Sequence, residues 1–139
     1  MGLDMYAYLA KKRNENAKGV YDTDHEVFTK DWYIVDDDYH YWRKNRHLHN
    51  WMKKKYLENG GPDEDFNCSY LVLTAEDIDD LRDDIKKGVV EQMDSQGFFF
   101  GRGDYAEYYK EEDLKFCEDA IAELKELGGD FAVIYTSWW

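Results

Sequence analysis

The chain has 139 residues, with 18 Lys and Arg against 31 Asp and Glu, so its formal net charge is −13 at pH 7. This length suits a single domain over residues 1–139, because two separate cores would each bury too little surface. A hydrophobic content of 43% and an aromatic content of 17% exclude a disordered acidic tail. The negative charge argues against a protein that coats DNA with a basic surface.

Cysteine use and hydropathy indicate the compartment. Cys68 and Cys117 show no metal-ligand spacing, and two cysteines do not make a disulfide framework, which favours a reducing cytoplasm. The first ten residues lack the basic start and long apolar stretch of a signal peptide, and no run approaches the roughly 18–20 apolar residues of a membrane span. We therefore expect a soluble, cytosolic protein without a membrane partner.

The first part of the chain predicts a strand, an extended segment and a long helix. Apolar residues alternate with polar or aromatic ones along residues 3–9, which is typical of a half-buried strand. A weaker extended pattern covers residues 27–35. An acidic turn at residues 36–38 leads into a helix over residues 39–58, whose apolar face consists of Tyr41, Leu48, Met52 and Tyr56.

Two more helices follow, each with a capping signal. Thr74 is placed to cap the second helix and Asp77 supplies the capping acid, ahead of an apolar stripe of Ile78, Leu81, Ile85 and Val89. Asp104 and Glu107 resemble a capping box for the third, which ends at glycines 128 and 129 and has the stripe Leu114, Cys117, Ile121 and Leu124.

Residues 69–73, 97–101 and 131–136 predict three further short strands, since they are apolar runs bounded by turn residues. The order of strands and helices indicates an α+β domain, in which a small mixed β-sheet of about four strands is covered by three helices.

One segment is basic although the chain is acidic. Residues 40–57 hold six Lys and Arg and no acid, so the remaining 121 residues carry 12 basic and 31 acidic side chains, a net of −19. On a helix, Trp42, Arg46, His49 and Lys53 would align. Such a surface could hold a nucleotide or a nucleotide-derived signal, through Trp42, Arg43, Lys44, Arg46, His49 and Trp51. The alternative interpretation is that the basic helix pairs with the protein's own acidic body.

The second predicted helix has the opposite charge, with six acids within residues 76–84. Acids are favoured near a helix N-terminus, but carboxylates four residues apart repel each other. Four of them fall on one face, where they could imitate nucleic-acid phosphates and occupy a basic groove: Glu76, Asp80, Asp83 and Asp84. The alternative is an ordinary solvated face.

No pattern indicates a reaction, a metal or a cofactor. His40 and His47 would share a face of the first helix, whereas His47 and His49 would point about 160° apart and could not share one ion. Cys68 and Cys117 are interpreted as core residues rather than nucleophiles. An enzyme is therefore not the expected class, although nothing excludes one.

Four segments together resemble a widespread family of small tailed-phage and prophage proteins: MGLDMY at the start, YWRK…HLHNW at 41–51, GFFFG…DYAEYY at 97–109 and the terminal YTSWW. The resemblance implies a phage-encoded accessory protein acting in the bacterial host. It places motif positions at Trp42, Arg43, Lys44, His49, Trp51, Cys68, Tyr105, Tyr108 and Trp139. The chain has Asn45-Arg46 where the family has Ala-Asn, and Arg102-Gly103 where it has Ser-Thr, so Arg46 is a local addition.

The charge layout and the resemblance together predict a non-enzymatic inhibitor. It would bind the basic nucleic-acid-binding surface of a host protein, such as a defence nuclease, through the acidic row Glu76, Asp80, Asp83 and Asp84. A small-molecule binder that uses the basic, Trp- and His-rich segment 40–57 is the alternative. The sequence leaves the oligomeric state open, self-association included.

Overall fold

The computed structural model describes residues 2–12, 32–61, 64–93 and 107–139. Its strands are β1 (Asp4–Lys12), β2 (Trp32–Arg43), β3 (Tyr70–Leu73) and β4 (Phe131–Trp138). Its helices are α1 (Arg46–Glu58), α2 (Ala75–Lys86) and α3 (Glu107–Leu127), with a 3-10 turn, η2 (Val90–Gln92), after α2. The predicted α+β class is confirmed. The predicted strand at residues 97–101, the Asp104 cap and residues 27–31 lie outside the described residues.

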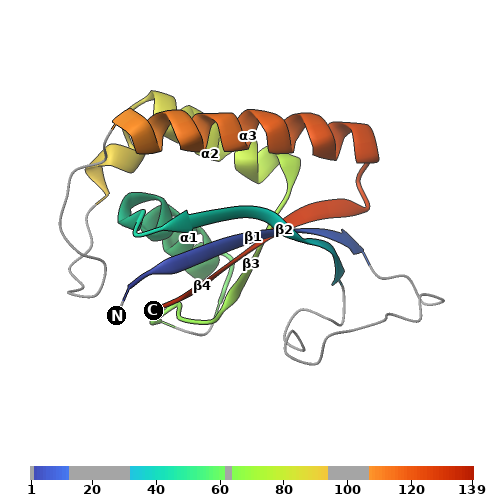
Figure 1. Cartoon of the computed structure of the whole chain (residues 1–139), viewed down its shortest axis with the longest axis horizontal. Helices are drawn as coiled ribbons and strands as arrows, with labels where there is room; N and C mark the ends of the chain where they lie inside the picture. The colour runs from blue at the N-terminus through green and yellow to red at the C-terminus, as the bar shows by residue number, and fades with distance from the viewer. Residues whose placement is uncertain (1, 13–31, 62–63, 94–106) are drawn as a thin grey trace.

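The four strands form one sheet in the order β2-β1-β4-β3. Every pairing among the described strands is antiparallel, so the expected mixed sheet is wrong. The central strands are β1, near the N-terminus, and β4, at the C-terminus, and each edge strand runs antiparallel to the central strand beside it. Figure 1 shows the two termini at the same end of the sheet, consistent with the pairing of Asp4 with Trp138.

One face of the sheet and all three helices enclose a single core. The alternation predicted for β1 is confirmed, because Leu3, Met5, Ala7 and Leu9 are all buried. Helices α2 and α3 pack side by side over this face, and α1 contacts β3 and η2 (Figure 1). The core therefore fixes the position of every helix surface relative to the sheet.

The predicted helix over residues 39–58 begins too early, because residues 39–43 belong to β2. Tyr41 pairs with Tyr6 of β1 and is exposed, and it does not share an apolar face with Leu48. Lys44 then adopts a positive φ of 59° and donates its backbone N–H to Leu3 O, which reverses the chain. The Asn45 side chain accepts from Leu48 N and caps α1.

Helix α2 begins as predicted and ends earlier than its apolar stripe suggests. The Thr74 side chain accepts from Asp77 N and the Asp77 carboxylate accepts from Thr74 N, so the capping box is confirmed. The helix ends at Lys86, and Gly88 has a positive φ of 81°. Val89 consequently lies outside the helix and is exposed, while Val90 is buried in its place.

A buried polar cluster joins β2, α1 and α3. The Asp113 carboxylate of α3 is fully buried and accepts from Trp42 Nε1 at 2.9 Å. It also accepts two contacts from Asn45 Nδ2, at 2.9 and 3.1 Å. A buried charge is tolerated only when donors surround it, so this cluster fixes the strand-to-helix turn against α3.

Candidate functional site

The acidic residues of α2 differ in what lies beside them. Asp77 and Asp84 bind α1 directly and Asp79 binds Arg82, whereas Glu76, Asp80 and Asp83 are exposed. Asp80 and Asp83 also line a pocket between α1 and α2, and Asp84 is only half-exposed. The predicted row of four is thus an exposed row of three, which we call the α2 acidic row: Glu76, Asp80 and Asp83.

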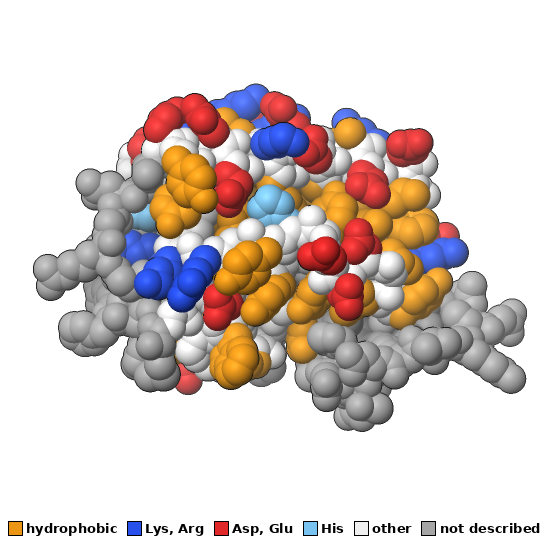
Figure 2. Space-filling model, viewed as in Figure 1, with side chains coloured by type: hydrophobic (Ala, Val, Ile, Leu, Met, Phe, Trp, Pro, Cys, Tyr) orange, Lys and Arg blue, Asp and Glu red, His pale blue; other side chains and the backbone are white. Residues whose placement is uncertain are grey.

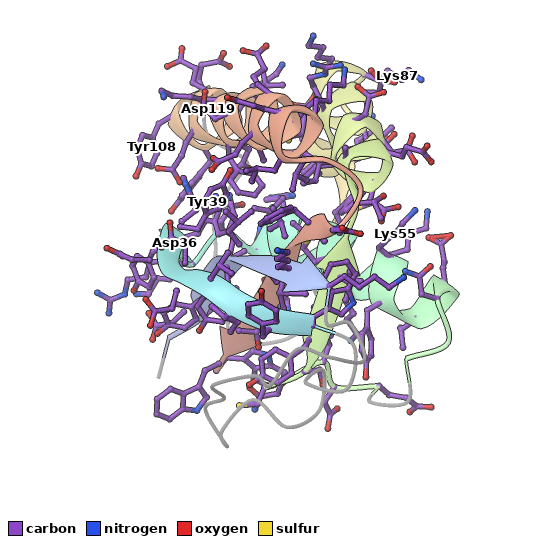
Figure 3. The ribbon with its side chains drawn as sticks, turned by 90° about the vertical axis from the view of Figure 1, so that its right-hand side faces the viewer. Asp36, Tyr39, Lys55, Lys87, Tyr108 and Asp119 are labelled. Carbon is purple, nitrogen blue, oxygen red and sulfur yellow. The ribbon has the colours of Figure 1, made fainter. Side chains whose placement is uncertain are left out.

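Asp77 and Asp84 bind the basic helix α1. Trp51 Nε1 of α1 donates to Asp84 Oδ2 at 2.9 Å, and Lys55 Nζ lies 3.3 Å from Asp77 Oδ1. A pocket of about 280 Å³ lies between the two helices. Its lining includes Lys54 and Lys55 of α1, Lys87 at the end of α2, and the α2 acids Asp80, Asp83 and Asp84. Figure 3 shows Lys55 and Lys87 on the same side of the molecule. This geometry supports the interpretation that the basic helix pairs with the acidic body.

The α2 acidic row belongs to a larger negative layer. Helix α2 contains six acids and two bases, and α3 contains eight acids and three bases, so the two helices hold 14 acidic and 5 basic side chains, a net of −9. Exposed pairs such as Lys115–Asp119 at 3.0 Å neutralise only part of it. Acidic side chains of the layer are visible along its upper surface in Figure 2. The result is a rigid anionic surface.

The six side chains predicted to hold a nucleotide do not form one surface. Trp42, His49 and Trp51 are buried, with 1%, 0% and 5% of their surface exposed. Arg43 and Lys44 are exposed in β2 and in the turn that follows, whereas Arg46 is the first residue of α1. The expected alignment of Trp42 with Arg46 and His49 on one helix is wrong, because Trp42 belongs to a strand.

His49 is part of the core. Its Nδ1 lies 2.8 Å from the hydroxyl of Tyr135, and its ring packs against Phe66. Burial, and then the charge of nearby Lys53, lowers the pKa of His49 to about 3, so the imidazole is neutral at physiological pH. A neutral, buried ring cannot neutralise a phosphate.

The two cysteines differ from each other. Cys117 is buried, and burial followed by the charge of Asp113 raises the pKa of its thiol, which makes it an inert core residue as expected. Cys68 is exposed with a positive φ of 60°, so its expected place in the core is wrong. Within the described ranges no group of three His, Cys, Asp or Glu is arranged to hold a metal. His40 lies in β2, so it does not share a helical face with His47.

Comparison with known proteins finds no matching family model, no similar curated protein and no similar solved structure. In the part of the chain that the structure describes, no helix has both the length and the apolar character needed to cross a bilayer.

Sequence reasoning missed a groove between β2 and α3, because residues 39–43 were placed on a helix. The missed signal is the strand-forming composition of residues 39–42, which are aromatic with His40 as the exception and follow the extended segment predicted up to residue 35. The three aspartates at 36–38 indicated a turn, yet they lie within the strand, where Asp36 pairs with Leu9.

Proposed function

We propose that this protein is a non-enzymatic inhibitor, which uses the anionic α2–α3 layer to bind and block the nucleic-acid-binding surface of a host protein. The observation that carries the proposal is the α2 acidic row. Glu76, Asp80 and Asp83 are exposed, and no ion pair to them occurs in the described part of the molecule. Asp80 and Asp83 also line the pocket that Lys54, Lys55 and Lys87 share, but their exposed carboxylates can still meet a cationic partner.

The row has features in common with a phosphate backbone. Residues three and four apart on a helix lie about 5–6 Å from each other, so the row presents fixed charges at regular intervals. The capping box at Thr74 and the burial of Ile78, Leu81 and Ile85 hold the helix in place, so little ordering is needed on binding. A basic surface that evolved to bind phosphates would meet a preformed row of carboxylates.

The charge of the layer also affects how fast a partner is found. A net of −9 on two adjacent helices attracts a basic surface over roughly a Debye length, about 8 Å at physiological salt. Association should therefore be fast and should weaken as salt is added. The resemblance to small phage proteins supports a bacterial host as the setting and a nucleic-acid-handling defence protein as the target.

Affinity capture from a bacterial lysate tests the proposal. The intact protein would be immobilised, the lysate treated with nuclease, and bound proteins eluted with rising salt and identified. We expect nucleic-acid-binding proteins that elute with salt and are released by an added DNA duplex. The variant Glu76→Lys/Asp80→Lys/Asp83→Lys should lose them.

A matched control separates the α2 row from net charge. Asp36, Asp37 and Asp38 are exposed on β2, so reversing them to Lys changes the net charge by the same +6 at a distant surface. Circular dichroism would check that both variants fold. Equal losses in both variants would show that total charge, rather than the α2 row, determines binding, and the proposal would fail.

A further inference from the structure

A groove of about 560 Å³ lies between β2 and α3, on the opposite side of the molecule from the α1–α2 pocket. Tyr39 and His40 contribute its β2 wall, and Glu112, Phe116 and Glu123 are among the residues of its α3 wall. Figure 3 shows Tyr39 and Asp119 on the side away from Lys55 and Lys87. The groove therefore borders the anionic layer without including the α2 acidic row.

Aromatic rings line the base of the groove. The His40 ring lies 5.1 Å from Phe116 and 4.2 Å from Trp42, and Tyr39 meets Phe116 edge-on at 6.4 Å between centroids. Figure 2 shows hydrophobic side chains on this face between acidic ones, with a histidine among them. Aromatic rings beside carboxylates attract organic cations.

The acids of the groove differ in their hydrogen-bond and ion-pair partners. Tyr39 OH donates to Glu123 Oε2 at 3.2 Å, and Lys115 binds Asp119. Glu112 forms no ion pair with a Lys or Arg in the described part of the chain, and His40 Nε2 lies 3.9 Å from its Oε1. Burial lowers the pKa of His40 and raises that of Glu112, so the imidazole is neutral near pH 7 and gives this carboxylate little compensation.

The His40 side chain also lines the groove. Its Nε2 is shielded from solvent, has no hydrogen-bond partner among the described residues, and lies 3.9 Å from the Glu112 carboxylate. The groove thus holds a carboxylate that lacks a full counter-charge.

We propose that this groove binds the guanidinium group of an arginine side chain from a partner polypeptide. The planar cation would pack against the half-buried rings of Tyr39 and His40, and its N–H donors would reach the Glu112 carboxylate. Glu112, Asp119 and Glu123 outnumber Lys115, which gives the lining a net charge of −2 with His40 neutral.

Arginine fits these features better than lysine does. Guanidinium carries five donors on a flat, weakly hydrated frame, and it stacks on rings while it binds a carboxylate. An ammonium group is compact and strongly hydrated, so it would gain less from the aromatic rings. The inference does not rest on the proposed function, because the groove and the α2 acidic row use different residues.

Nuclear magnetic resonance titration of the intact protein with N-acetyl-arginine amide tests this proposal. We expect saturable shifts of the His40 ring and Tyr39 signals, weaker shifts with N-acetyl-lysine amide, and none with the neutral isostere N-acetyl-citrulline amide. Glu112→Gln should weaken binding of the arginine probe about fivefold, as for a partly exposed charged pair. Glu118→Gln, an equal charge change on the exposed side of α3, should leave it unchanged.

Three results would overturn the proposal: no shifts near His40 with the arginine probe, equal shifts with citrulline, or equal weakening by Glu112→Gln and Glu118→Gln. The Glu76→Lys/Asp80→Lys/Asp83→Lys variant should still bind the arginine probe. Loss of capture by that variant together with an empty groove would leave the proposed function standing and refute only the groove. If the groove binds arginine but the α2 reversal has no effect on capture, the proposed function is refuted and the groove proposal stands.

Discussion

Trp51 of α1 donates its indole N–H to the carboxylate of Asp84 of α2, at 2.9 Å. The sequence had assigned these two residues to different sites, a nucleotide site and a protein-binding row, and the fold joins them to each other. Their bond, with the Lys55–Asp77 pair beside it, explains why a basic helix occurs in an acidic protein. It also removes Asp84 from the surface offered to a partner.

The Trp51–Asp84 bond should contribute measurably to stability. Asp84→Ala leaves a partly buried indole N–H without its acceptor, so we expect the free energy of unfolding to fall by about 1–2 kcal/mol. Asp83→Ala removes a neighbouring carboxylate that is exposed, and it should change the free energy of unfolding by less than about 0.5 kcal/mol. Urea unfolding of both variants measures the difference, and equal values would mean that the bond adds nothing.

The buried Asp113 cluster should be more sensitive. Asp113→Asn keeps an oxygen that can accept from Trp42 Nε1, but it replaces the second oxygen, which Asn45 Nδ2 contacts at 2.9 Å, with an NH₂ donor. We expect a loss of about 1–3 kcal/mol, since two buried donors then face each other. Glu118→Gln, an equal charge change at an exposed site on the same helix, is the control. Thermal unfolding compares them, and a loss no larger than that of the control would show that Asp113 is not what holds the turn.

Buried histidine predicts how stability depends on pH. The pKa of His49 is lowered from 6.5 to about 3 by burial and then by Lys53, so the unfolded chain takes up a proton that the folded chain does not. Stability is therefore unaffected above pH 6.5 and falls as the pH drops towards about 3, with a slope that approaches about 1.4 kcal/mol per pH unit.

Denaturant unfolding between pH 7 and pH 5 measures this slope before most carboxylates titrate. His49→Gln should reduce it, and the lowered pKa of His40 leaves a residual slope of the same sign. A slope that is identical in the wild type and in His49→Gln would contradict a buried neutral imidazole.

The local features of the fold were predictable because neighbouring residues determine them. The alternation in β1 and the Thr74–Asp77 capping box depend on periods of two and three residues, and both are confirmed. The boundary between β2 and α1 was not predictable in this way. It depends on pairing with β1, on the Lys44–Leu3 bond and on Asp113, which is 68 positions from Asn45.

The sequence predicts that the candidate site is rich in acidic residues, but it does not predict which of them form a surface. The acids of residues 76–84 can be read directly, but a helical wheel does not say which neighbour each one meets. Only the position of α1 shows that Asp77 and Asp84 bind it directly, whereas Asp80 and Asp83 line the pocket beside it and stay exposed. The groove at His40 was hidden for the same reason, because its two walls are far apart in sequence.

The central claim is that the α2 acidic row competes with nucleic acid for a basic surface. The most direct measurement is fluorescence anisotropy of a labelled DNA duplex bound to the purified captured partner, as increasing amounts of this protein are added. Release of the duplex by the wild type and by Asp36→Lys/Asp37→Lys/Asp38→Lys, but not by Glu76→Lys/Asp80→Lys/Asp83→Lys, is the predicted result. A duplex that stays bound at saturating wild-type protein, or is released equally by both variants, would contradict it.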